Sequence, residues 1–138
     1  MVVDQNFLKV KKYFLLLIFF ILFASKGYSN NYKFTKIIEL NEPWGSSFIN
    51  NNEIIITEKS GKIKIVNVVS KEVSEIKHNL NFLEVGQGGL LDIIHQDNTL
   101  WISYSENRGD GKTSTSIAKA ILNKKELSFK NIFQANPP

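Results

Sequence analysis

The chain has 138 residues and carries 17 lysines and arginines against 13 acidic residues, with no cysteine. The lack of cysteine excludes disulfides, thiolate metal sites and the lipid-modified cysteine of a lipoprotein. Without residues 1–29 the basic and acidic side chains number 13 and 12, and no basic stripe with interleaved aromatics remains, which excludes nucleic acid as a partner.

The first residues have the three-part layout of a secretory signal peptide. Lysines at positions 9, 11 and 12 precede an apolar run over residues 13–24, and a short polar stretch follows. As a helix the 12 apolar residues would be about 18 Å long, too short for a hydrocarbon core of about 30 Å. The sequence therefore predicts a signal-peptide helix in residues 1–29, with the membrane contacted only during export.

From residue 34 onward, short β-favouring runs alternate with turn residues, without a sustained helical period. In the first half the predicted strands cover residues 34–40, 45–49, 53–58, 62–68 and 72–77. Residues 54–56 are three isoleucines, which predicts an inner strand packed on both faces. Lys62-Ile63-Lys64-Ile65 alternates strictly, so we expect its isoleucines in a core and its lysines in water.

The second half repeats this rhythm. Its predicted strands cover residues 90–94, 100–105, 116–122 and 127–133. Closely spaced antiparallel strands in sets of about four are typical of propeller blades, although a sandwich or a barrel has a similar pattern. Residues 135–138 have the composition of a connecting loop, so we expect an all-β chain that stops before its domain is closed.

The densest chemical signal is Gly86-Gln87-Gly88-Gly89. Glycines permit backbone conformations and close approaches that side chains block. The Gln87 amide is able to donate and accept hydrogen bonds to a planar, oxygen-rich ligand. The bare pattern alone favours a tight turn with a solvent-exposed glutamine. A phosphate-binding P-loop is excluded, because the Gly-Lys-Ser/Thr ending is missing.

Asp92, His95 and Asp97 are close enough in sequence to be drawn as a metal cluster. In a strand, however, Asp92 and His95 point to opposite faces, which favours a surface histidine near a turn. His78 falls in a predicted loop, and the sequence shows no partner for it. We therefore predict no metal site from these residues.

Two glutamates and two tryptophans complete the set of candidates. Glu58 and Glu106 lie at strand ends, and we predict that they are solvated or support hairpins. Trp44 and Trp101 lie within or beside strands, where core packing is favoured over stacking on a cofactor. No nucleophile with an adjacent base and no carboxylate pair can be argued from this sequence.

Four segments in order resemble the opening of the soluble PQQ-dependent sugar dehydrogenases, also called glucose/sorbosone or aldose sugar dehydrogenases. They are Glu-Pro-Trp-Gly at 42–45, Ile-Thr-Glu-Lys-Ser-Gly-Lys-Ile at 56–63, Gly-Gln-Gly-Gly-Leu-Leu-Asp at 86–92 and Ile-Ser-Tyr-Ser-Glu at 102–106. The resemblance covers nearly all of residues 35–138 but only about the first third of the family domain.

The resemblance implies a six-bladed β-propeller that holds pyrroloquinoline quinone (PQQ) over its centre, with calcium alongside. Residues 30–138 would then be a truncated propeller domain of about two blades, preceded by the signal peptide. Gln87 matches a glutamine that contacts the quinone, and it is the one cofactor-binding residue implied here. The family's catalytic histidine is expected after Pro138, as are the calcium ligands, so the resemblance implies no catalytic or metal residue in this chain.

The implied activity is oxidation of an aldose sugar at C1 to the lactone, with the hydride passing to PQQ and the electrons to an external acceptor. We expect the enzyme to be exported, periplasmic or secreted, and the chain alone to be inactive. One alternative is a noncatalytic exported propeller that binds carbohydrate or protein. Another is a complete small β protein with an unrelated binding role.

Overall fold

The computed structural model describes residues 10–16, 18 and 32–137. Residues 10–16 and 18 are helical, and most of the predicted signal peptide lies outside the described residues. Among the described residues, no helix has the length and apolar character needed to cross a membrane. The chain divides into two compact units, Met1–Thr35 and Lys36–Pro138.

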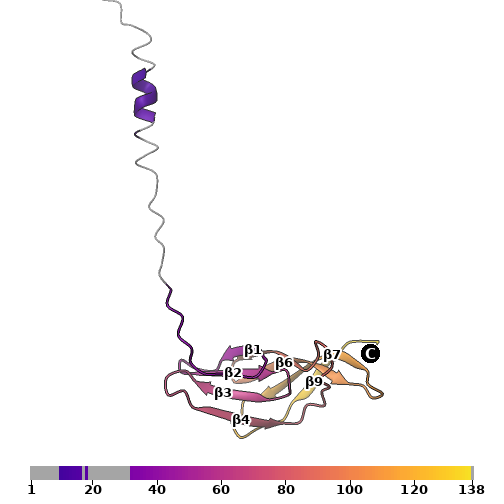
Figure 1. The fold of residues 1–138 in the computed structure, drawn as a ribbon. Helices are drawn as coiled ribbons and strands as arrows, with labels where there is room; N and C mark the ends of the chain where they lie inside the picture. Colours follow the sequence, from indigo (N-terminus) through magenta and orange to yellow (C-terminus); the bar gives the residue numbers. More distant parts are fainter. Residues whose placement is uncertain (1–9, 17, 19–31, 138) are drawn as a thin grey trace, which may run out of the picture. The chain divides into compact units, whose positions relative to one another are not determined.

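The described part of Lys36–Pro138 is all-β and contains two sheets (Figure 1). Sheet 1 contains, in order, β1 (Pro43–Phe48), β2 (Glu53–Glu58), β3 (Ile63–Asn67), β4 (Val73–His78) and β8 (Glu126–Leu127). Sheet 2 contains β5 (Leu90–Gln96), β6 (Thr99–Asn107), β7 (Thr113–Ile121) and β9 (Lys130–Gln134). Consecutive strands pair antiparallel within each sheet, whereas β8 pairs with β4 in parallel.

Most predicted strands are confirmed within a few residues, but two predictions are wrong. Residues 34–40 form no strand, and no described strand pairs with them. Residues 127–133 are not one strand, because the chain leaves sheet 1 after β8 and enters sheet 2 as β9. Strand propensity therefore located these segments without identifying their partners.

The middle strands of sheet 1 follow the predicted pattern. On β2, Ile55 and Ile56 point to opposite faces and are 0% and 8% exposed, which confirms an inner strand packed on both sides. On β3, Ile63 and Ile65 are buried as predicted. Lys64 is the exception, because its ammonium pairs with a buried carboxylate and is largely withdrawn from water.

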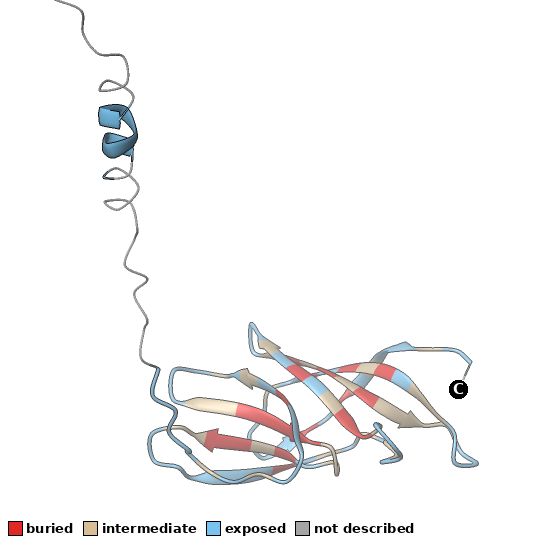
Figure 2. Ribbon diagram, turned by 45° about the horizontal axis from the view of Figure 1, so that its top comes forward, coloured by how far each residue is buried: buried red, intermediate tan, exposed pale blue. Residues whose placement is uncertain are grey.

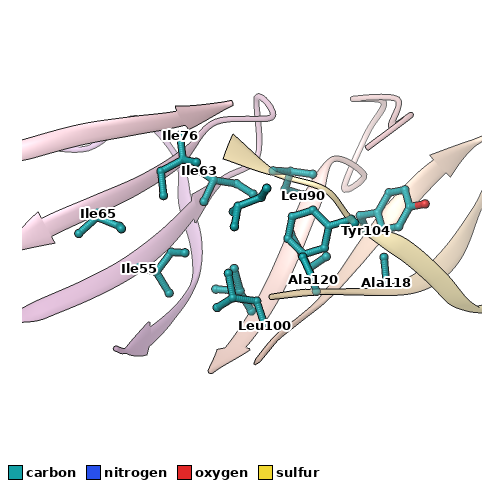
Figure 3. Packing of buried hydrophobic residues seen from close by; sticks show 13 residues of the cluster. Ile55, Ile63, Ile65, Ile76, Leu90, Leu100, Tyr104, Ala118 and Ala120 are labelled. Carbon is teal, nitrogen blue, oxygen red and sulfur yellow. The ribbon is translucent and has the colours of Figure 1, made fainter. Parts of the chain in front are cut away.

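Side chains from both sheets form one hydrophobic core, shown in Figure 3. Sheet 1 contributes Ile55, Ile63, Ile65 and Ile76 from one face, and sheet 2 contributes Leu90, Ile93, Leu100, Ile102, Tyr104, Ala118 and Ala120. Each fully buried aliphatic side chain of this size stabilises the fold by about 1.5–3 kcal/mol. Buried residues concentrate in the middle of the strands, and the loops are mostly exposed (Figure 2).

Two sets of polar contacts join the sheets. The hydroxyl of buried Thr57 accepts a hydrogen bond from the Gly45 N–H (3.0 Å) and donates one to the Leu91 carbonyl (2.5 Å), so β2 is tied to β5. The Asn79 side chain donates to the Phe129 carbonyl (3.1 Å) and accepts from the Phe129 N–H (2.7 Å). This second set holds the segment between β8 and β9 beside the end of β4.

Candidate functional site

The candidate site is the turn at residues 86–89, which immediately precedes β5. The Gly88 N–H donates to the Val85 carbonyl at 2.8 Å and closes the turn. Gly86 and Gly89 have φ angles of +57° and +143°, which residues other than glycine rarely adopt. Gln87 is exposed between them, as the tight-turn interpretation predicted.

Both sheets fix the position of this turn. The Leu90 N–H donates to the Lys59 carbonyl at the end of β2 (3.3 Å), and the Ser105 N–H on β6 donates to the Gly89 carbonyl (2.9 Å). A Cβ on Gly89 would lie 2.2 Å from the Lys59 carbonyl oxygen, and one on Gly88 would lie 2.8 Å from the Ser105 hydroxyl. Gly89 is therefore required by close packing between the two sheets, and Gly88 by close packing against β6.

Gln87 presents its amide to solvent from this rigid support. No described residue forms a hydrogen bond with that amide, so two donor hydrogens and the carbonyl oxygen are available to a ligand. This arrangement fits one contact with a planar, oxygen-rich cofactor such as PQQ. Lys59, whose side chain is 18% exposed, lies against Gly89 and has one carboxylate, that of Glu42, at 4.0 Å.

Asp92, His95 and Asp97 are not brought together as a site. Asp92 is exposed on the same face as Ile94, and its carboxylate accepts a hydrogen bond from the Ile93 N–H (2.9 Å). His95 pairs across the sheet with the core residue Leu100, which confirms that it faces away from Asp92, but its Nε2 is buried, so the prediction of a surface histidine is wrong. Asp97 lies in the β5–β6 turn with a φ of +49°. No three His, Asp or Glu side chains of the described residues are grouped closely enough to hold a metal ion.

His78 has partners that the sequence did not reveal. It ends β4, its Nε2 lies 2.7 Å from the Gly61 carbonyl oxygen, and its Nδ1 accepts from the Leu80 N–H at 3.2 Å. Its ring also lies 6.1 Å from that of Phe82. The prediction of an unpartnered loop histidine is wrong, because both ring nitrogens hold the chain where it leaves sheet 1.

Glu58 is buried and accepts a hydrogen bond from Lys64 across the β2–β3 hairpin, so of the two predicted roles the support of a hairpin is confirmed and the solvated carboxylate is wrong. Its side chain is 1% exposed, and its Oε1 accepts hydrogen bonds from the Lys64 ammonium (2.7 Å) and the Asn41 N–H (2.8 Å). Its Oε2 has no hydrogen-bond partner among the described residues. Burial raises the pKa of Glu58, but the hydrogen bonds from Lys64 and Asn41 and the Lys64 charge outweigh burial and hold the pKa below its ordinary value.

Glu106 is also withdrawn from water, with a side chain 13% exposed. It accepts hydrogen bonds from the Ser116 hydroxyl (2.6 Å), the Asn131 amide (2.8 Å) and the Gln134 amide (2.8 and 2.9 Å). The Arg108 Nε lies 3.1 Å away but is not aligned for a hydrogen bond, so Arg108 contributes its charge. Burial raises the pKa of Glu106, but these four partners outweigh burial and hold the pKa below its ordinary value.

Neither tryptophan belongs to the buried core, so the prediction of core packing is wrong for both. Trp44 is 47% exposed on β1. Trp101 is half-buried and lines a shallow apolar hollow with Ile94 and Ile117 on the face of sheet 2 that points away from the core. Alternation along β6 places the smaller residues Leu100 and Ile102 in the core instead.

Sequence reasoning also missed the polar network around Glu106. One signal for it was present, because Ile-Ile-Thr-Glu at 55–58 and Ser-Tyr-Ser-Glu at 103–106 place a glutamate at the same point of β2 and β6. The partners on β9 are 25 and 28 residues away from Glu106. Only the fold brings them to the carboxylate.

The chain is similar to known sugar dehydrogenases over most of its described length. The aldose sugar dehydrogenase YliI of Escherichia coli (strain K12) is 28% identical over an alignment of 108 residues, and the match covers 72% of this chain and 29% of that protein. The crystal structure of the soluble aldose sugar dehydrogenase of Escherichia coli in the apo form has a TM-score of 0.65 at 29% identity, and the match covers 71% of this chain and 31% of that one.

A third similarity concerns the fold alone. The PQQ-bound form of the aldose sugar dehydrogenase of Streptomyces coelicolor has a TM-score of 0.62 at 17% identity, covering 72% of this chain and 32% of that one. This chain thus spans about a third of the length of the relatives it matches. The family model described as glucose/sorbosone dehydrogenase matches residues 40–138. Because that match includes both sheets and the turn at Gln87, the chain belongs to the glucose/sorbosone dehydrogenase family.

Proposed function

We propose that this chain is part of an exported quinoprotein that oxidises aldose sugars at C1 to lactones, with PQQ as the hydride acceptor and an external electron acceptor. Membership of the glucose/sorbosone dehydrogenase family supports the reaction class. The observation that carries the proposal is the turn at Gln87, which both sheets fix and which leaves the amide free for a ligand. The corresponding architecture is a six-bladed propeller in which this chain supplies two blades.

Gln87 would position the reactants and would not transfer a proton. PQQ, when bound, supplies the acceptor for the hydride from the anomeric carbon. The Gln87 amide would hold a quinone or sugar oxygen through hydrogen bonds, and the end of its turn is fixed by the bonds of Leu90 to Lys59 and of Gly89 to Ser105. Ordering the ligand against a rigid turn costs less conformational entropy than ordering a mobile loop.

Proton removal requires a base that the described residues do not place beside Gln87. Both ring nitrogens of His78 are engaged by backbone groups, and the Nε2 of His95 is buried without a partner. We propose that the base belongs to the part of the family domain that follows the region matched here. No three His, Asp or Glu side chains of the described residues lie close enough together to hold calcium, so we assign it no ligand in them.

A chimera tests this function directly. In the E. coli aldose sugar dehydrogenase, the 108 matched residues would be replaced by the corresponding residues of this chain. We expect the folded chimera to reduce a dye in the presence of PQQ and an aldose, because the missing base would come from the relative. A folded chimera without this activity would contradict the proposal.

The isolated chain provides the complementary measurement. We expect the purified 138-residue chain to show no PQQ-dependent dye reduction with any aldose, because the described residues near Gln87 orient a ligand without supplying a base. Sugar oxidation by the isolated chain would contradict the proposal that this chain orients the reactants and that the base lies in another part of the family domain.

A further inference from the structure

Two lysines of the β2–β3 hairpin are equally withdrawn from water but differ in their partners. The side chains of Lys59 and Lys64 are each 18% exposed, whereas that of Lys62 is 52% exposed. The Lys64 ammonium donates a hydrogen bond to the Glu58 carboxylate at 2.7 Å. The Lys59 ammonium has no hydrogen-bond acceptor among the described residues, and its one ion-pair partner among them, the Glu42 carboxylate, lies 4.0 Å away. Withdrawing an ammonium from water without an acceptor is costly, so Lys59 lacks a partner that Lys64 has.

The fold holds Lys59 beside the turn that carries Gln87. The Lys59 N–H donates to the Glu42 carbonyl at 3.0 Å, and the Lys59 carbonyl accepts from the Leu90 N–H at 3.3 Å. The Cγ of Lys59 lies 3.0 Å from the point that a Cβ on Gly89 would occupy. The absence of a side chain at Gly89 therefore gives the aliphatic stem of Lys59 room to pass against the turn, two residues after Gln87.

The surroundings of the Lys59 ammonium leave it available to a negatively charged oxygen. Its Nζ is not sealed from solvent, and the Glu42 side chain is itself 57% exposed. An ion pair at 4.0 Å with an exposed carboxylate contributes little, because water competes for both groups. A direct hydrogen bond from an ammonium to an anionic oxygen is roughly twice as strong as one between neutral groups. A ligand oxygen would therefore replace Glu42 as the partner of Lys59.

We propose that Lys59 is a second cofactor-contacting residue, whose ammonium holds a negatively charged oxygen of the bound quinone beside Gln87. This inference rests on the function proposed above. The carboxylate groups of PQQ are acceptors of the kind that Lys59 lacks among the described residues. Glu42 and the cofactor then compete for the same ammonium, because both are negatively charged.

Titration of PQQ into the folded apo chimera with the E. coli enzyme tests this contact, with calcium present and sugar absent. Lys59→Met keeps an unbranched apolar stem against Gly89 and removes only the charge, so we expect the Kd for PQQ to rise about tenfold. Lys59→Arg should recover most of the affinity. Lys62→Met is the matched control and should leave the Kd unchanged, because Lys62 is half exposed and pairs with Glu75 at 3.4 Å. Quenching of tryptophan fluorescence measures the Kd in each variant.

Glu42→Gln separates a cofactor contact from a purely structural ion pair. Removing the competing carboxylate should lower the Kd for PQQ about threefold, in the direction opposite to Lys59→Met. A structural pair would instead give weaker binding, or no change, in both variants. Added salt should also weaken PQQ binding more in the unmodified chimera than in the Lys59→Met variant, because only the former retains the ammonium.

The outcomes distinguish this inference from the proposed function. An unchanged Kd for PQQ in a Lys59→Met chimera that still oxidises aldoses would overturn the role of Lys59 alone. A raised KM for the aldose with an unchanged Kd for PQQ would also overturn it, because Lys59 would then contact the sugar. A folded chimera that binds no PQQ would overturn the proposed function together with this inference.

Discussion

Sheet 1 and sheet 2 both withdraw a glutamate near the end of their second strand from water, fully for Glu58 and largely for Glu106, but they stabilise it by different means. Glu58 in sheet 1 has one ammonium and one backbone N–H on the same oxygen, while its second oxygen has no partner among the described residues. Glu106 in sheet 2 has three hydrogen-bonding side chains and a nearby guanidinium. The difference indicates that Glu58 depends on one side chain, that of Lys64, whereas the side-chain partners of Glu106 are redundant.

The comparison of the two glutamates assumes that sheet 1 and sheet 2 unfold as one unit. The largest loss of stability is therefore expected from a substitution at the contact between the two sheets. Gly89→Ala places a Cβ 2.2 Å from the Lys59 carbonyl oxygen at a φ of +143°. Overpacking and backbone strain together should lower the free energy of unfolding by about 4 kcal/mol. Urea denaturation measures this loss.

Gly86→Ala is the matched control for that variant. Nothing lies within 4 Å of a Cβ at Gly86, and its φ is +57°. The cost should therefore be only the backbone strain, about 1–2 kcal/mol. Equal losses for the two variants would show that the turn is not wedged between the sheets.

Removal of the partner of each glutamate measures the proposed difference directly. Lys64→Met leaves the buried Glu58 carboxylate without its counter-charge and should cost about 3 kcal/mol of unfolding free energy. Arg108→Met should cost about 1 kcal/mol, because the hydrogen bonds from Ser116, Asn131 and Gln134 remain. A larger loss of unfolding free energy in the Arg108 variant than in the Lys64 variant would show that Glu106, and not Glu58, depends more on its charged partner.

Asn79→Ala tests whether the segment after β8 holds sheet 1 and sheet 2 together. The substitution leaves the N–H and the carbonyl of Phe129 without their partners, and should cost about 2 kcal/mol. Asn123→Ala is a suitable control, because Asn123 is confined to a local hydrogen bond with the Lys125 N–H. A loss of the same size in both variants would contradict this role for Asn79.

Among these tests, acidification should change the free energy of unfolding least. The pKa values of Glu58 and Glu106 are lowered in the folded chain, so both carboxylates stabilise the fold above the unfolded glutamate value of about 4.3. That stabilisation is lost as the pH falls through the folded values, by about 1.4 kcal/mol for each unit of lowering. Urea midpoints measured between neutral pH and about pH 3 should fall less in a Glu58→Gln, Glu106→Gln double variant than in the unmodified chain.

Local patterning predicted the strands and the turn well. Alternation in residues 62–65 placed Ile63 and Ile65 in the core, and the glycines at 86–89 located a tight turn with an exposed glutamine. These features depend on residues that are close in sequence. The position of Gln87 as a cofactor contact came from the family resemblance and stays a prediction.

The features that sequence reasoning missed depend on contacts between distant residues. The partners of Glu106 lie on β7 and β9, and the strand prediction for residues 34–40 failed because pairing needs a neighbour as well as propensity. Trp44 and Trp101 were misassigned because their burial depends on which sheet face has a neighbour, and hydrophobicity alone does not determine that.

The effect of Gln87→Ala in the chimera with the E. coli aldose sugar dehydrogenase tests the central claim most directly. Gln96→Ala is the matched control, because Gln96 is also exposed and ends β5 away from the turn. Loss of hydrogen bonds to the reactants should lower PQQ-dependent aldose oxidation by about tenfold in the Gln87 variant. The account predicts unchanged oxidation in the Gln96 variant, and equal activity in the two variants would contradict a role for the turn at the reaction site.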